Sequence, residues 1–196
     1  MIKKNLLHIF CALTIIFSLL SCENNYMPRP RGYYRIDMPK KEYIKFDSTF
    51  PYTFYYPVYT KIVADKYSKN QPFWINIEYP EFKGSIHISY KKINNNLNDY
   101  LEDTRTLVMK HIPKATSIGE KIIINKPENV YGKIYNIEGN ATASTYQFYL
   151  TDSTDNFLRA ALYFNVEPNN DSLQPVIDFI KDDIDYFIET FKWKGI

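Results

Sequence analysis

The thiol of Cys22 is the side chain with the most specific chemical setting in this sequence. It ends the segment Leu19-Leu20-Ser21-Cys22, which closes an apolar run that begins at Leu6 and follows Lys3 and Lys4. A basic start, a short apolar segment and a small residue near its exit are typical of an export signal. A helix that crosses a bilayer needs about 20 apolar residues, and the polar residues after Cys22 end this run too early. The thiol therefore lies at the exit of an export signal.

The same four residues resemble the bacterial lipobox, in which a lipid is added to the cysteine and the chain is cut before it. This resemblance implies that residues 1–21 are a lipoprotein signal peptide and that Cys22 is the lipid-attachment residue. A lipid with more than one acyl chain anchors a protein stably, at about 0.8 kcal/mol per buried CH₂. The alternative is an ordinary signal peptide with a chance cysteine. We expect no cofactor other than this covalent lipid.

Other chemically versatile side chains are few. Cys11 leaves with the signal peptide, so the folded part has no thiol for catalysis, a disulfide or a metal site. His87 falls on the polar face of a predicted strand, and His111 ends a predicted helix, where a positive charge is favoured. Neither histidine has a second ligand at metal-binding spacing. We predict no catalytic residue and no metal site, and hence a protein that is not an enzyme.

Two sets of side chains have alternative interpretations. The acids Asp178, Asp182, Asp183 and Asp185 cluster on a predicted helix, where we interpret them as a solvated face. The aromatic residues could stack on sugars in a glycan-binding surface or simply fill the core. The exposed-side candidates for glycan binding are Trp74, Tyr55, Tyr59, Tyr131 and Tyr135.

The charge balance argues against a nucleic-acid partner. Of the 24 basic residues, Lys3 and Lys4 belong to the signal peptide, so the mature chain carries 22 charges of each sign. The imbalance is local, because residues 29–45 are mainly basic while residues 171–190 are mainly acidic. We predict a Pro/Arg-rich membrane tether over residues 22–45, which serves as a spacer or docks on the domain or on a partner. Either these two oppositely charged segments attract each other, or each of them contacts something other than the opposite segment.

Periodicity predicts the elements that follow the tether. Alternation over residues 82–91 places Phe82, Ile86 and Ile88 on one face and His87 on the other, which faces solvent or a partner. Apolar residues at helical spacing predict a helix over residues 97–111 and a long final helix that Asp171 or Ser172 caps. Further strands are predicted over residues 50–56, 58–64, 73–79, 121–125, 130–138, 143–151 and 157–167.

This order of elements predicts one α+β domain over residues 46–196. We expect a single antiparallel sheet, covered by the middle helix and by the long C-terminal helix. The order of elements is similar to that of the PsbP/Mog1-type α/β/α sandwich.

A longer pattern near the start of the mature chain is more specific. The lipobox, the segment Pro28 to Pro39 (PRPRGYYRIDMP), the dipeptide Phe46-Asp47 and the segment Pro51 to Pro57 (PYTFYYP) together resemble the gliding-motility lipoprotein GldD family of Bacteroidota. The length and the closing Thr190-Phe191-Lys192 agree with this resemblance. The family has no assigned catalytic residue, so none is transferred to this chain.

The resemblance implies a non-catalytic accessory or assembly component of the gliding-motility and type IX secretion machinery. Such a protein is lipid-anchored in the cell envelope and faces the periplasm, on the inner or the outer membrane. Its partners are the membrane and proteins of that machinery. We assign partner binding to Arg29, Arg31, Gly32, Tyr34 and Arg35. The alternative is a lipoprotein that binds a glycan or peptidoglycan.

Overall fold

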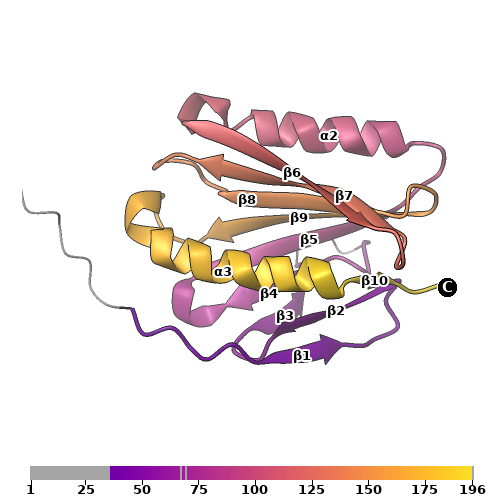
Figure 1. Cartoon of the computed structure of the whole chain (residues 1–196), viewed down its shortest axis with the longest axis horizontal. Coiled ribbons are helices and arrows are strands. Elements are labelled where there is room, and N and C mark those ends of the chain that lie inside the picture. The colour runs from indigo at the N-terminus through magenta and orange to yellow at the C-terminus, as the bar shows by residue number, and fades with distance from the viewer. Residues whose placement is uncertain (1–35, 67, 69, 196) are drawn as a thin grey trace, which may run out of the picture. The chain divides into compact units, whose positions relative to one another are not determined.

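The computed structural model in Figure 1 describes residues 36–66, 68 and 70–195. Within these residues the chain is a mixed α+β domain, as predicted, with two α-helices and antiparallel strands. The helices are α2 (Leu97–Met109) and α3 (Asn170–Thr190), and two short 3₁₀ turns are η1 (Pro80–Phe82) and η2 (Ile112–Lys114). The strands are β1 (Tyr43–Phe46), β2 (Tyr52–Pro57), β3 (Lys61–Ala64), β4 (Ile75–Tyr79), β5 (Gly84–Lys92), β6 (Ser117–Asn125), β7 (Val130–Glu138), β8 (Tyr146–Thr151), β9 (Asn156–Phe164) and β10 (Lys192–Trp193).

The strands form two sheets, which corrects the prediction of a single sheet. Seven strands pair in the order β3-β4-β5-β9-β8-β7-β6, and a separate sheet has the order β1-β2-β10. The strand predicted over residues 50–56 exists as β2, but it pairs with β1 and β10 rather than with the large sheet. Alternation along a strand shows which residues share a face, and it carries no information about which strand lies alongside.

The two faces of the large sheet bury different sets of side chains. The apolar residues Ile86, Ile88 and Tyr90 of β5 are buried in the main core, whereas His87 between them is exposed. This alternation confirms the predicted strand and its polar face. The main core also takes in Tyr52, Phe54 and Tyr56 of β2. The small sheet therefore packs on the core side of the large sheet, the side that Ile86 and Ile88 face.

Each helix covers one face of the large sheet (Figure 1). The apolar ladder of α3, which includes Ile180, Ile184 and Phe187, packs into the main core together with Ile134 of β7. On α2, Val108 packs against Tyr135 of the same strand β7, in a second and smaller cluster. Since Ile134 and Tyr135 point to opposite faces of β7, α2 and α3 lie on opposite sides of the sheet.

The folded part reaches back into the segment that the sequence assigns to the tether. β1 spans the boundary that we placed between residues 45 and 46, and it pairs along its whole length with β2. Met38 also packs against the main core. Residues 22–35 of the proposed tether and the signal peptide lie outside the described residues.

The start of α3 differs from the prediction that Asp171 or Ser172 caps it. The helix begins at Asn170, and Asn169 is its N-cap residue. The backbone N–H of Asp171 donates to the side-chain oxygen of Asn140, and the buried side chain of Asn170 donates to the carbonyls of Gly139 and Thr142. A tertiary contact thus satisfies the first turn, which a local capping pattern could not indicate.

Candidate functional site

The residues to which the sequence assigns function lie outside the described part of the chain. These residues are Cys22, Arg29, Arg31, Gly32, Tyr34 and Arg35. Their roles therefore stay predictions. Two regions of the described domain bear on function: the contact that receives the incoming tether, and a hollowed face of the large sheet.

The incoming chain is fixed to α3 through Asp183, a contact that we call the N-terminal latch. The carboxylate of Asp183 accepts hydrogen bonds from the hydroxyls of Tyr43 and Tyr59, each at 2.8 Å. The Lys41 Nζ lies 3.2 Å from Asp183 Oδ1, donates to the carbonyl of Phe179 at 2.9 Å, and also pairs with Asp182. The basic segment before the domain therefore does meet the acidic helix at this point.

Asp183 corrects the interpretation of the α3 acids as one solvated face. Asp183 is only 1% exposed to solvent, whereas the side chain of the neighbouring Asp182 is 74% exposed. Asp185 is half-buried and accepts from the hydroxyl of Tyr146 at 2.9 Å. Burial, and then the hydrogen bond and negative charge of Asp183, raise the pKa of Tyr43 and of Tyr59. Both hydroxyls consequently stay protonated and keep donating to the carboxylate.

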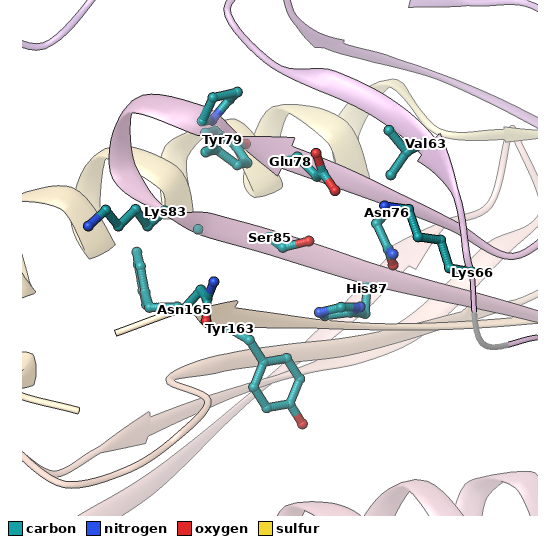
Figure 2. Close-up of a pocket in the computed structure, with 13 residues that line it drawn as sticks. Val63, Lys66, Asn76, Glu78, Tyr79, Lys83, Ser85, His87, Tyr163 and Asn165 are labelled. Carbon is teal, nitrogen blue, oxygen red and sulfur yellow. The ribbon is translucent and has the colours of Figure 1, made fainter. Parts of the chain in front are cut away.

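Two adjoining hollows mark the α2 side of the large sheet. The first, of about 680 Å³, lies over β4, β5 and the end of β9 and is drawn in Figure 2; Asn76, Ser85 and His87 project from neighbouring strands toward it. The second, of about 450 Å³, lies between the sheet and α2 and is lined by Trp74, Tyr100, Arg159 and others. Asn76 and His87 line both hollows and so join them.

Arg159 of β9 is a half-buried cation on this face. Its Nη2 donates to the amide oxygen of Gln147 at 2.6 Å, but its buried Nε has no hydrogen-bond partner in the described part of the chain. No described carboxylate forms an ion pair with it. Burial lowers the pKa of Arg159, because the charged form loses water, against the opposing influence of the Tyr163 side chain. A buried polar group is normally paired, so Arg159 keeps hydrogen-bonding capacity that the described residues do not use.

His111 does not carry the positive charge that the end of a helix favours. The Gln147 amide oxygen accepts from Arg159, so its NH₂ group faces His111 Nε2 at 3.0 Å. Since an amide NH₂ only donates, His111 Nε2 accepts, and the ring is neutral. Burial, and then the nearby charge of Arg159, lower the pKa of His111. The His87 side chain is exposed, but partial loss of water around its ring still lowers its pKa, against the opposing influence of Asp65 and Glu78.

The aromatic residues considered for glycan binding do not form one surface. Trp74 lines the second hollow, where its indole N–H donates to the carbonyl of Tyr90 at 2.6 Å. Tyr59 belongs to the N-terminal latch, Tyr55 packs near Tyr186 of α3, and Tyr135 is buried beneath α2. Sequence reasoning missed Arg159 and Asn76, although the polar alternation of the neighbouring strand β5 indicated this face.

Within residues 36–195, with 67 and 69 left aside, no group of three or more His, Cys, Asp or Glu is placed to hold a metal ion. No helix in this part of the chain is both long and apolar enough to cross a membrane.

Comparison with known proteins gives a family match over most of the chain. The family model described as gliding motility lipoprotein GldD matches residues 23–193. No curated protein matches the sequence. Among solved structures, the chain resembles the solution structure of cyanobacterial PsbP (CyanoP) from Synechocystis sp. PCC 6803. The two share 10% sequence identity, with 90% of this chain and 99% of that chain covered and a TM-score of 0.49.

Proposed function

This chain belongs to the gliding motility lipoprotein GldD family, and on that premise we propose that it is a non-catalytic accessory or assembly component of the gliding-motility and type IX secretion machinery. A lipid on Cys22 holds it in the cell envelope, with the domain facing the periplasm. The observation that carries this proposal is the family match, which begins one residue after Cys22 and covers almost the whole of the mature chain.

The N-terminal latch gives this proposal a mechanical basis. Lys41 and Tyr43 bind Asp183, and β1 pairs with β2, so the chain that leads to the anchor is joined directly to α3 and to the small sheet. The domain is thereby held within a short length of chain from Cys22. A position fixed near the membrane suits a protein that works by contact with others.

Partner binding is assigned to Arg29, Arg31, Gly32, Tyr34 and Arg35. The test is affinity purification of the lipidated chain from native membranes, with mass spectrometry of its partners and of the lipid on Cys22. Replacing the three arginines by alanine should remove the partners while the domain stays folded. The matched control replaces three exposed lysines of the domain, Lys61, Lys92 and Lys114. Equal recovery of partners with both variants would disprove docking through the arginines.

A second candidate function, binding of a glycan or peptidoglycan, is favoured by Arg159 and the two hollows. Carboxylate-bearing peptidoglycan fragments suit a guanidinium without a carboxylate partner, because hydrogen bonds between two charged groups are strong. Calorimetric titration of the folded protein with soluble fragments tests this function. Arg159→Gln should weaken binding about tenfold or more, whereas Arg105→Gln on α2 should not. Undetectable binding to the unaltered protein would exclude this ligand class.

A further inference from the structure

The strand β6 forms one border of the large sheet and leaves one backbone edge open. It runs over nine residues and pairs with β7 along one side only. No other described strand lies along its outer side. An open strand of this length is a template for pairing with another chain, unless bulges, prolines or charges block it. β6 contains no proline, and its register with β7 is continuous from Ser117 to Asn125.

Two exposed isoleucines lie on one face of this open strand. Ile122 is 69% exposed and Ile124 is 64% exposed, the highest values for large apolar side chains in the described part of the chain. They stand opposite Lys133 and Tyr131 of β7, on the α2 side of the sheet. Glu120 shares this face, and Lys126 follows the strand at the same spacing. The face thus offers one acid, two apolar side chains and one base in a row.

We propose that β6 pairs antiparallel with β6 of a second copy of this chain, about a two-fold axis at Ile123. Two identical antiparallel strands related by such an axis place one residue opposite its own copy. An axis at Glu120 or Lys121 sets like charges opposite each other, which is unfavourable. An axis at Ile123 sets Ile122 opposite the partner's Ile124, and Glu120 opposite the partner's Lys126. The two-fold axis makes each of these pairs occur twice. The row of Glu120, Ile122, Ile124 and Lys126 is therefore complementary to the same row of the second copy.

This pairing gives hydrogen-bond partners to the backbone N–H and C=O groups of the open edge. It also covers the two exposed isoleucines. Opposite charges and apolar pairs directly across neighbouring strands stabilise a sheet. Lys121, on the other face, meets the partner's Asn125 rather than a second lysine. The large sheets of the two copies then join into one continuous sheet. A strand from a different protein could use the same edge, and the experiment distinguishes that case.

Cysteine cross-linking of the full chain in its native membrane tests the proposal. The sequence has cysteines only at positions 11 and 22, so a thiol introduced in β6 reports on β6 alone, with the unaltered chain as background control. Ile123→Cys should give a disulfide-linked dimer, since this residue faces its own copy. Ser117→Cys, at the exposed end of the same strand, should not. Chains carrying Ile122→Cys and Ile124→Cys, expressed together, should cross-link to each other.

The interface can also be weakened without touching the cross-linked position. In the Ile123→Cys background, Ile122→Asp should lower the dimer yield at least tenfold. The matched control is Ile112→Asp. Ile112 is also an exposed isoleucine, at 56%, but it lies in η2 outside β6. This substitution should leave the dimer yield unchanged. A folded Ile123→Cys chain that gives no dimer overturns the proposal. So does equal cross-linking at Ser117→Cys, or a cross-link to a different protein.

Discussion

The hydroxyl of Tyr43 donates a hydrogen bond of 2.8 Å to the carboxylate of Asp183, which lies 140 positions later in the chain. Tyr59 donates to the other oxygen of the same carboxylate, and Lys41 supplies the countercharge. A buried carboxylate is tolerated only with such partners. Together with the pairing of β1 with β2, the contact therefore holds the end of the proposed tether, residues 41–43, against the domain.

Replacing Asp183 by asparagine should destabilise the domain. The amide keeps one acceptor oxygen, but it loses the charge that pairs with Lys41 and presents an NH₂ group to a tyrosine hydroxyl. Because hydrogen bonds to a charged group contribute about 1.5–3 kcal/mol each, we expect a loss of about 2–3 kcal/mol in the free energy of unfolding, measured with urea. Asp182→Asn removes the exposed partner of the same lysine and should cost less than about 1 kcal/mol. Equal losses of unfolding free energy in Asp183→Asn and Asp182→Asn would show that the buried position of Asp183 adds nothing to the stability.

The same latch should make the domain sensitive to alkali. The pKa values of Tyr43 and Tyr59 are raised in the folded protein above the usual 10.0. The unfolded chain therefore loses these protons first, so the stabilisation is complete below about pH 10 and declines as the pH rises further. Urea unfolding at a series of alkaline pH values should show this decline. In the double variant Tyr43→Phe, Tyr59→Phe the decline should be shallower, and an unchanged slope would contradict the assignment.

The β8–β9 connection should depend on Asp152. Its Oδ1 accepts from the backbone N–H groups of Thr154, Asp155 and Asn156 at 2.9–3.0 Å. Burial alone would raise the pKa of Asp152, but these hydrogen bonds and the Asn156 side chain outweigh it and lower the pKa. Asp152→Ala should cost about 1–3 kcal/mol of stability, because three donors lose their acceptor.

The control for this connection is Asp155→Ala, which removes an exposed carboxylate from the same turn. We expect a change within about 0.5 kcal/mol. Since the folded pKa of Asp152 is depressed, its contribution is present above the ordinary pKa of 3.8 and is lost as the pH falls further. In acid unfolding, the Asp152→Ala variant should not show the loss of stability that protonation of Asp152 causes. An unaltered acid transition would show that the turn does not depend on the carboxylate.

The elements of the domain follow from sequence patterns much better than their arrangement does. The apolar ladder of α3 and the alternation in β5 are local, and the structure confirms both elements. β1 and β10 were missed because they are four and two residues long and exist only through pairing with β2. The division into two sheets depends on these same long-range pairings.

The site residues show the same limit. Asp183 was interpreted as solvated because the residues that bury and bind it, Tyr43 and Tyr59, are far away in sequence. Arg159 lies on a predicted strand, yet its lack of a carboxylate partner becomes visible only when β5, β8 and α2 surround it. Charge and spacing predict where a side chain points, whereas its partners depend on the tertiary fold.

Gly132 provides the sharpest test of the packing between β7 and β8. A Cβ atom at this position would lie 2.0 Å from the carbonyl oxygen of Tyr149, which is backbone of the neighbouring strand and cannot move without disturbing the ladder. Gly132→Ala should therefore cost about 3 kcal/mol or more. At Gly119 in β6 the nearest atom to an added Cβ would be 3.9 Å away, so Gly119→Ala should change the stability by less than about 1 kcal/mol. Urea unfolding of both variants measures the difference, and similar stabilities would mean that β7 and β8 approach each other less closely than the structure shows.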